Sequence, residues 1–272
     1  MYPRTKSGAD RHRKAKRERE ISISFQTIVG HLPAIKDGSG KRLTVLEFGS
    51  GQGFQIPELE QIGELYASDI YVSERIKHLM PGLKFTRCSM VEAPFKDAQF
   101  DIIYSNHVLE HIEDIEGALK ELRRIGKNDC IFAFSVPTNI WLILALPAIY
   151  YNKLRSIGGR ILRKIKAEKK IEKPVKNTFL ARGNDASRRN GILSSILPQG
   201  HGVHRDYLEC YRFFKIKNWV KLFEQNNFEI IKRQSLLFYA PSEWPIVPVI
   251  AVRGNSRLGS SVLFLLKKST AE

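Results

Sequence analysis

The sequence predicts an α/β protein in which a mostly parallel sheet carries helices on both faces. Short apolar runs typical of buried strands alternate with stretches of helical periodicity between residues 43 and 136. Parallel neighbouring strands need long crossover connections, and the intervening helices supply them. The chain has 272 residues, of which 43% are hydrophobic and 26% charged, so it can bury the core of such a sheet.

The predicted elements follow one another in a regular order. The first strand, residues 43–48, stops at a glycine-rich turn over residues 49–53, and helical periodicity follows from residue 56. Further strands are predicted at 64–68, 84–88, 100–105 and 129–136, with helices around 75–79 and over 108–125. The alternation then breaks, and a helix over 207–226 with strands at 228–231 and 260–266 completes the pattern. This order favours a doubly wound sheet.

The basic residues are concentrated in two segments. Lys and Arg number 44 against 28 Asp and Glu, which gives a net charge of +16. Residues 1–20 carry +5 and residues 153–190 carry +10, so the rest of the chain is close to neutral. We therefore predict a basic tail at 1–20, one folded domain made of residues 21–138 and 203–272, and a basic and apolar cap inserted at 139–202, after the fifth strand.

The three cysteines, Cys88, Cys130 and Cys210, form neither a disulfide framework nor a CxxC metal motif. They favour a reducing compartment. The first 20 residues are basic and lack the apolar stretch of a secretory signal. The expected location is the cytoplasm. A peripheral position at the inner face of a membrane is compatible with it.

The glycine-rich turn points to a cofactor that contains adenosine. Glycine lets the backbone turn sharply and approach a ligand closely at the carboxyl end of a parallel strand. Asp69 lies 20 residues after Gly49, at the end of the next predicted strand, where a carboxylate can accept hydrogen bonds from both ribose hydroxyls. The spacing is GxGxG with Glu47 two residues ahead, which differs from the GxGxxG of dinucleotide sites.

Four motifs follow one another along the chain: VLEFGSGQG at 45–53, ASDI at 67–70, EAPF at 92–95 and FDIIYSNHVLEH at 100–111. In this order they resemble the class I S-adenosylmethionine-dependent methyltransferases, particularly the small-molecule, type 11-like branch. The resemblance implies a Rossmann-like doubly wound sheet of seven mostly parallel strands, with the cap inserted after the fifth. It also implies an enzyme that uses S-adenosylmethionine as its methyl donor.

The resemblance further implies which residues hold the cofactor. Glu47 would meet the methionine amino group through its neighbourhood, Asp69 would hold the ribose hydroxyls, and Ile70 would pack on adenine. Ser89 stands where the family commonly has an Asp that contacts the adenine amino group, and its hydroxyl can still accept a hydrogen bond. The full predicted set is Glu47, Phe48, Gly49, Gly51, Gly53, Asp69, Ile70, Ser89, Met90 and Asn106.

Histidines are the candidates for a general base, because imidazole exchanges its proton near neutral pH. His107 is the first candidate, and it shares one face of the predicted 108–125 helix region with His111, four residues on. His204 lies in the loop that returns from the cap. A capping or packing role for the first two and a solvated loop for the third are the structural alternatives. No metal is predicted, because a third ligand at a recognisable spacing is absent.

The cap suggests where the acceptor comes from. Its apolar run over residues 139–151 is too short to span a bilayer, but its Trp and Tyr residues and the basic residues that follow suit an anionic membrane surface, with residues 140–176 in contact. The alternative is a helix that covers the core and a solvated basic arm. A membrane-facing cap suits a lipid-linked or isoprenoid acceptor. Resemblance to methyltransferases found with cell-surface polysaccharide and isoprenoid pathways implies a small or lipid-linked acceptor of the glycan or isoprenoid type, and oxygen is the expected site of methylation.

Nucleic acid is the rival partner, since basic segments neutralise phosphates. The residues at 105–108, Ser-Asn-His-Val, differ from the Asn/Asp-Pro-Pro-aromatic motif of amino-directed base methyltransferases, and the basic arm has few aromatic residues for stacking. Nucleic acid is therefore the less favoured partner. An RNA-associated methyltransferase and a non-catalytic cofactor-binding interaction module remain as alternatives.

Overall fold

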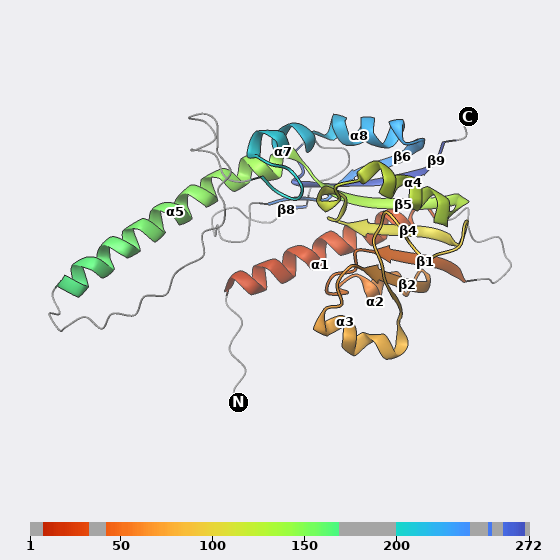
Figure 1. Ribbon diagram of the computed structural model, residues 1–272, viewed down its shortest axis with the longest axis horizontal. Helices are drawn as coiled ribbons and strands as arrows, with labels where there is room; N and C mark the ends of the chain where they lie inside the picture. The colour runs from red at the N-terminus through yellow and green to blue at the C-terminus, as the bar shows by residue number, and fades with distance from the viewer. Residues whose placement is uncertain (1–7, 33–41, 169–199, 240–249, 252–257, 270–272) are drawn as a thin grey trace.

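A seven-stranded sheet forms the centre of the structure, a computed structural model that describes residues 8–32, 42–168, 200–239, 250–251 and 258–269 (Figure 1). A separate two-stranded ribbon pairs β7 with β8. The strands in chain order are β1 (Leu43–Phe48), β2 (Gly63–Asp69), β3 (Lys84–Arg87), β4 (Phe100–Asn106), β5 (Gly126–Pro137), β6 (Phe228–Ser235), β7 (Leu237–Phe238), β8 (Ile250–Ala251) and β9 (Ser261–Lys268).

The large sheet has the strand order β3-β2-β1-β4-β5-β9-β6. Parallel pairing joins β3, β2, β1, β4 and β5, and β9 runs antiparallel to both β5 and β6. The chain winds outward from β1 in one direction and then returns to continue from β4 in the other. The crevice at the carboxyl ends of β1 and β4 is therefore a topological switch point, where open α/β sheets bind ligands. The predicted doubly wound, mostly parallel sheet of seven strands is confirmed.

Apolar side chains alternate between the two faces of the sheet. In β1, Val45 packs with Ile28 of α1, whereas the next residue, Leu46, packs in the cluster on the opposite face. In β9, Leu263 packs in the same cluster as Val45, and Phe264 packs in the cluster on the opposite face. Successive side chains of a strand point to opposite faces, so continuous apolar runs indicate strands that are covered on both sides.

Helices cover both faces. Residues of α1 (Gly8–Val29), α2 (Ile56–Leu59) and α3 (Glu74–Leu79) join the cluster on one face. Residues of α4 (Ile115–Ile125), α7 (Tyr207–Phe213) and α8 (Ile216–Gln225) join the cluster on the other. Two short 3₁₀ helices, η1 (Met80–Gly82) and η2 (Leu109–His111), complete this part of the fold.

Two predicted helices are each divided in the structure. The predicted helix over 108–125 becomes η2 followed by α4, because Asp114 begins a new helix by accepting a hydrogen bond from the amide of Gly117 at 2.9 Å. The predicted helix over 207–226 becomes α7 and α8. Asp206 caps α7 through the amide of Glu209, and the chain leaves the helix at Phe214 and Lys215 before α8 begins.

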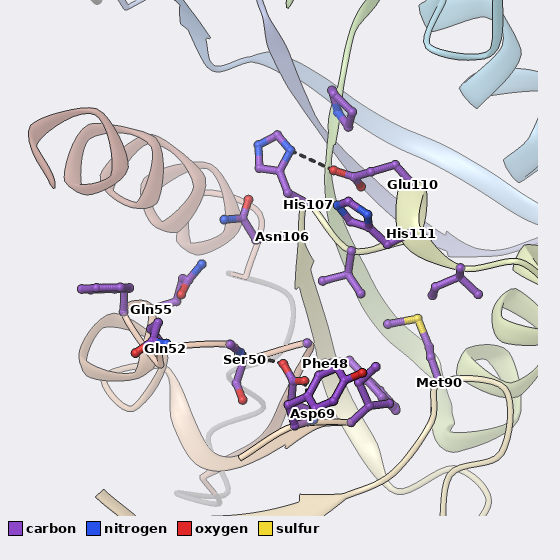
Figure 2. Close-up of a pocket in the computed structure, with 18 of the residues that line it drawn as sticks. Phe48, Ser50, Gln52, Gln55, Asp69, Met90, Asn106, His107, Glu110 and His111 are labelled. Atoms are coloured by element: carbon purple, nitrogen blue, oxygen red, sulfur yellow. Dashed lines mark hydrogen bonds and ion pairs between the residues drawn. The ribbon is translucent and has the colours of Figure 1, made fainter. Parts of the chain in front are cut away.

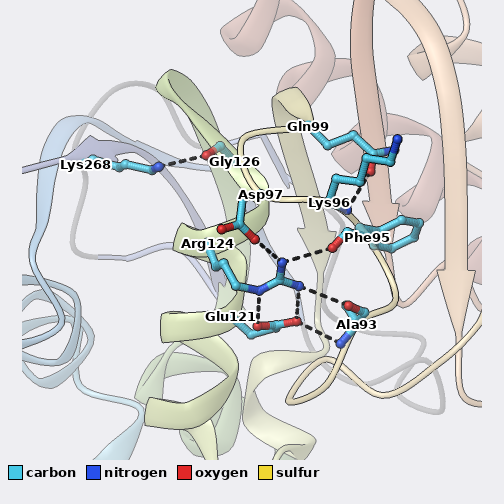
Figure 3. Close-up of polar contacts among 9 residues, drawn as sticks. All are labelled: Ala93, Phe95, Lys96, Asp97, Gln99, Glu121, Arg124, Gly126 and Lys268. Atoms are coloured by element: carbon cyan, nitrogen blue, oxygen red, sulfur yellow. Dashed lines mark hydrogen bonds and ion pairs between the residues drawn. The ribbon is translucent and has the colours of Figure 1, made fainter.

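The segment between β3 and β4 has no regular secondary structure and is held by one side chain (Figure 3). The guanidinium of Arg124 in α4 donates to the carbonyls of Ala93 and Phe95 at 3.1 and 3.0 Å and pairs with Glu121 and Asp97. Glu121 in turn accepts from the amide of Ala93 at 2.9 Å. This network fixes the loop on the helix, as expected for bidentate guanidinium pairing.

The first 20 residues are not only a tail. One helix, α1, runs continuously over Gly8–Val29, and Glu20 at the predicted boundary is 4% exposed. Ile21, Ser24 and Ile28 form a buried face of this helix, and Ile28 packs in the cluster on one face of the sheet, so a helix of the folded domain begins within the predicted basic tail. Charge counting missed this because basic residues are compatible with the exposed face of a helix.

The predicted cap begins with a single long helix, α5 (Asn139–Glu168), which extends well beyond the sheet (Figure 1). Its first turns are anchored to α7, where the hydroxyl of Tyr207 donates to the carbonyl of Leu142. Residues 169–199 of the predicted cap lie outside the described residues. Among the residues that the structure describes, no helix has both the length and the apolar character needed to cross a membrane.

Candidate functional site

The glycine-rich turn after β1 folds as the sequence predicts. Gly49, Gly51 and Gly53 have φ angles of +80°, +53° and +66°, which other residues adopt only with strain. The amides of Gly49 and Ser50 donate to the carbonyl of Ser68 in β2 at 2.8 and 3.0 Å, so the turn is tied to the end of the next strand. A Cβ on Gly49 would lie 2.3 Å from a methyl carbon of Val108, so the close packing also requires glycine there.

Asp69, at the end of β2, lies against this turn. One carboxylate oxygen accepts from the amide of Gly51 at 2.8 Å, and the other accepts from the amide of Tyr71 at 2.9 Å. Each oxygen has a further lone pair, so the fixed carboxylate can still accept two hydrogen bonds from a ligand. The glycine turn and Asp69, which the sequence places at the ends of successive strands, are thus in direct contact in the fold.

A cavity of about 1030 Å³ opens at the carboxyl ends of β1, β2 and β4. Figure 2 shows His107, Glu110 and His111 towards one end of it and Phe48, Ser50 and Asp69 towards the other. Most residues predicted for cofactor binding and catalysis line this cavity. They are Phe48, Gly49, Gly51, Asp69, Ile70, Ser89, Met90, Asn106, His107 and His111.

Glu47 and Gly53 were predicted to belong to the cofactor site, but neither lines the cavity. A Cβ on Gly53 would lie 2.7 and 2.8 Å from the terminal carbons of Ile56 and Ile76, so this glycine serves the packing of α2 and α3 under the turn. The carboxylate of Glu47 is 1% exposed and has no hydrogen-bond partner. Burial, reinforced by the charges of Asp69 and Glu58, raises the pKa of Glu47 to about 8.

His107 sits between two carboxylates and not on a helix. Its φ angle is +55°, and it ends β4 before η2 begins, so the predicted helical face shared with His111 is wrong. Its Nε2 lies 3.2 Å from Glu20 and its Nδ1 lies 3.3 Å from Glu110. Burial lowers the pKa of His107, but the charge of Glu20 and the hydrogen bonds to both carboxylates outweigh it and raise the pKa to about 9. Both ring nitrogens of His107 face carboxylates and the raised pKa favours the protonated ring, so this arrangement does not favour His107 as a general base.

His204 does not line the cavity, so its predicted catalytic role is not supported by its position. Its ring packs on Phe213 and Phe214, with centroid distances of 4.6 and 5.5 Å. His201, three residues earlier, faces the cavity instead, with its ring 5.0 Å from that of His111 and 4.9 Å from Trp141. Burial, with the neighbouring His111, lowers the pKa of His201.

Several residues of the cavity wall were not predicted from the sequence. They include Glu110, together with Lys16, Glu20, Trp141, His201 and Tyr239 from segments that carry no recognisable motif. Glu110 belongs to the motif at 100–111, so a carboxylate three residues after His107 was visible in the sequence. Nothing in the sequence indicated that the N-terminal segment contributes Glu20.

α1 forms one wall of the cavity. Lys16 Nζ lies 3.5 Å from the ring centroid of Tyr239, and Arg17 lies 4.1 Å from the ring centroid of Phe54, in the turn region after β1. Arg75 lies 4.2 Å from the ring centroid of Phe54 as well. These cation–π contacts, with the ion pair between Glu20 and His107, hold α1 against the turn after β1 and the end of β4.

Comparison with known proteins gives a consistent result. Residues 46–134 match the family model described as a methyltransferase domain. A malonyl-[acyl-carrier protein] O-methyltransferase of Halorhodospira halophila is 30% identical over 89 residues, which are 30% of this chain and 30% of the relative. The match therefore spans less than a third of that protein's length.

Two solved structures share the fold over nearly the whole chain. An S-adenosylmethionine-dependent methyltransferase of Thermotoga maritima is 20% identical, with a TM-score of 0.51 over 94% of this chain and 92% of the other. The magnesium protoporphyrin IX methyltransferase of Synechocystis, solved with bound S-adenosylhomocysteine, is 15% identical, with a TM-score of 0.50 over 98% of this chain and 90% of the other. At these sequence identities the two structures show a shared fold and nothing about the substrate.

Proposed function

Residues 46–134 form a class I methyltransferase domain of the type 11 branch, and on this premise we propose that the protein transfers a methyl group from S-adenosylmethionine to a small or lipid-linked acceptor. One observation carries the proposal. The glycine turn after β1 and the carboxylate of Asp69 after β2 are in direct contact at the topological switch point, and both open onto the large cavity.

The residues present fit this cofactor in three respects. No atom lies within 4 Å of the position of a Cβ on Gly51, so the backbone there leaves room for a ligand. Asp69 retains lone pairs for two ribose hydroxyls. The buried carboxyl group of Glu47 has no hydrogen-bond partner behind the turn, and a cationic ligand would favour its ionised form.

The bound cofactor would supply an activated methyl group on a sulfonium sulfur. Methyl transfer forms a bond from the acceptor atom to the methyl carbon and breaks the bond from that carbon to sulfur, whose electron pair stays on the sulfur. The chain has to hold both partners in line and keep water away. Asp69 and the glycine turn would hold the donor, and residues of α1 with Trp141 and Tyr239 line other walls of the cavity.

Asn106 stands at the boundary between the donor and acceptor parts of the cavity. It ends β4, lines the cavity, and its side-chain oxygen is buried without a hydrogen-bond partner. Such an oxygen accepts a hydrogen bond from a ligand, because an unpaired buried acceptor is costly. Both ring nitrogens of His107 lie beside carboxylates, Nε2 beside Glu20 and Nδ1 beside Glu110, so neither nitrogen is free to accept a proton from an acceptor.

The acceptor is proposed to be bound at an anionic membrane surface, and exposed residues in the first half of α5 support this. Ile143, Ile149, Tyr151 and Leu154 are exposed, with Leu154 at 69%. The sequence from residue 153 onward is strongly basic. Exposed apolar and aromatic side chains next to basic residues match an anionic leaflet in chemistry and charge. A glycan- or isoprenoid-type lipid-linked acceptor, methylated at oxygen, would be presented there.

Donor binding is tested first, by calorimetry with S-adenosylmethionine and the full chain. Binding with one site per chain, followed by release of S-adenosylhomocysteine with a lipid-linked acceptor fraction, is the expected result. A folded chain that does not bind S-adenosylmethionine would overturn the proposed activity.

The membrane part is tested by flotation with vesicles of phosphatidylglycerol and of phosphatidylcholine. A full-length variant with Leu154→Ser, Lys153→Gln and Arg155→Gln should lose flotation with the anionic vesicles. A matched control with Lys217→Gln, Lys221→Gln and Lys232→Gln, all exposed on the main body, should keep it. Equal flotation of both variants, or none for the intact chain while it binds S-adenosylmethionine, would direct the search to soluble acceptors.

A further inference from the structure

Three side chains with metal-binding atoms converge at the acceptor end of the cavity. Glu110 and His111 come from η2, and His201 comes from the loop before α7, 90 residues later in the chain. Their ligand atoms all lie within 4.8 Å of one another. All three residues line the cavity, and Glu110 and His111 lie at the end away from Asp69 (Figure 2).

The two segments that carry these residues are locked together by the backbone. The amide of Val203 donates to the carbonyl of Glu110 at 3.3 Å. A Cβ on Gly202, whose φ is +66°, would lie 2.0 Å from that same carbonyl oxygen, so only glycine permits this approach. The amide of His201 also donates to the sulfur of Cys210 in α7 at 2.9 Å. The relative position of the three side chains is therefore built into the fold.

Glu110 carries the independent observation that points to a ligand. Its side chain is 1% exposed, and its Oε1 lies 3.3 Å from His107 Nδ1. Its second oxygen, Oε2, is buried and has no hydrogen-bond partner. An unpaired buried carboxylate oxygen is costly, and a cation beside it removes that cost.

We propose that Glu110, His111 and His201 bind a divalent transition-metal ion, with Zn²⁺ as the best match to two imidazoles and one carboxylate. A set dominated by nitrogen argues against Mg²⁺ and Ca²⁺, which prefer oxygen ligands. Three protein ligands leave a coordination position free. Because the three ligands line the cavity, the free coordination position is open to the acceptor. The metal would bind a hydroxyl oxygen there, so the expected acceptors carry a hydroxyl group; this part of the inference rests on the proposed function.

Glu20 and His107 support this site from outside. Glu20 contacts Nε2 of His107, and Nδ1 of His107 contacts Oε1 of Glu110. These contacts orient the carboxylate of Glu110 and leave its Oε2 available to the metal. Partners of metal ligands commonly fix ligand orientation in this way.

The test uses the full chain after treatment with a chelator and measures Zn²⁺ binding by calorimetry and Co²⁺ binding by visible absorption. We expect one tight Zn²⁺ per chain and a cobalt spectrum with d–d bands. His201→Ala and Glu110→Gln should weaken Zn²⁺ binding at least about 10-fold, since even partners of the ligands contribute 10- to 100-fold. His111→Ala replaces an exposed residue, so this variant tests the site without disturbing the core.

His204→Ala is the matched control, because it removes a histidine from the same loop whose ring packs on Phe213. It should bind Zn²⁺ as the unaltered chain does. No Zn²⁺ binding by the folded chain, or equal binding by His111→Ala and the unaltered chain, would overturn the site. Calorimetry with S-adenosylmethionine on the same samples separates the two proposals, because Zn²⁺ binding without cofactor binding would retain the metal site and reject the methyltransferase.

Discussion

Glu20 Oε1 lies 3.2 Å from Nε2 of His107, so a residue of the basic N-terminal segment reaches the centre of the candidate active site. The same oxygen accepts a hydrogen bond from the hydroxyl of Ser261 in β9. The ionised form of Glu20 is favoured despite burial, because the charge of His107 and these hydrogen bonds lower the pKa of Glu20 to about 2. Through this one carboxylate, α1 is fixed to the end of β4 and to the antiparallel strand β9.

We predict that Glu20→Ala loosens α1. The substitution removes a charge-assisted hydrogen bond and leaves the Ser261 hydroxyl without its acceptor, which should lower the free energy of unfolding by about 1–3 kcal/mol. Amide hydrogen exchange in residues 8–29 should become faster. Glu18→Gln, which alters an exposed residue of the same helix, is the control. Unchanged exchange in Glu20→Ala would mean that the apolar face of α1 alone holds the helix.

We predict that Asp69→Ala weakens S-adenosylmethionine binding at least about 10-fold, since hydrogen bonds to a charged acceptor contribute about 1.5–3 kcal/mol each. The variant also loses the contact that fixes the Gly51 amide. Calorimetry measures the dissociation constant. Glu74→Gln, which changes an exposed carboxylate at the start of α3, should bind normally. An unaltered affinity in Asp69→Ala would remove this residue from the cofactor site.

We predict that Glu47 makes stability fall between about pH 4.5 and 8. Its pKa is raised from 4.5 to about 8 in the folded chain, so the unfolded chain loses this proton first and is favoured as the pH rises through that window. Glu47→Gln should therefore gain stability relative to the unaltered chain, by roughly 2–5 kcal/mol at pH 8 and by little at pH 4. Denaturant unfolding at both pH values measures the difference. A gain that is the same at both would exclude titration of Glu47 as its cause.

Cofactor binding should ionise Glu47. A cationic ligand on the cavity side of the glycine turn favours the ionised form of Glu47 behind it. At pH 7, binding should therefore release up to about one proton per chain. Calorimetry in buffers with different ionisation enthalpies counts the protons released. Glu47→Gln should bind more weakly and release none. Equal proton release by both forms would assign the titration to another group.

Gly51→Ala and Gly53→Ala should fail in different ways. Both positions have positive φ, so each substitution costs about 1–2 kcal/mol in backbone strain. At Gly51 the new methyl group meets no protein atom within 4 Å but enters the cavity side of the turn, so cofactor affinity should fall most. At Gly53 it meets Ile56 and Ile76 at less than 3 Å, so stability should fall further. Thermal unfolding and calorimetry on both variants distinguish the two effects.

The sequence determined the sheet and the cofactor half of the site. The apolar runs of the parallel strands, the glycine turn and Asp69 all lie within residues 43–137, and local periodicity and spacing are sufficient to place them. Residues that follow parallel strands meet at one edge of the sheet, so their contact could be predicted from chain order. Helix ends at Asp114 and Phe214 were missed because capping and turn geometry interrupt an apolar periodicity that continues past them.

Only the tertiary structure decided the acceptor half of the cavity. Glu20, Glu110 and His201 are far apart in the chain, and no spacing rule connects them. His201 and His204 are indistinguishable in the sequence, yet the turn at Gly202 directs one ring into the cavity and the other onto Phe213. Side-chain direction in a loop depends on backbone angles and on packing against distant elements. The sequence therefore determines which cofactor chemistry this fold supports, and long-range packing decides which side chains face the acceptor.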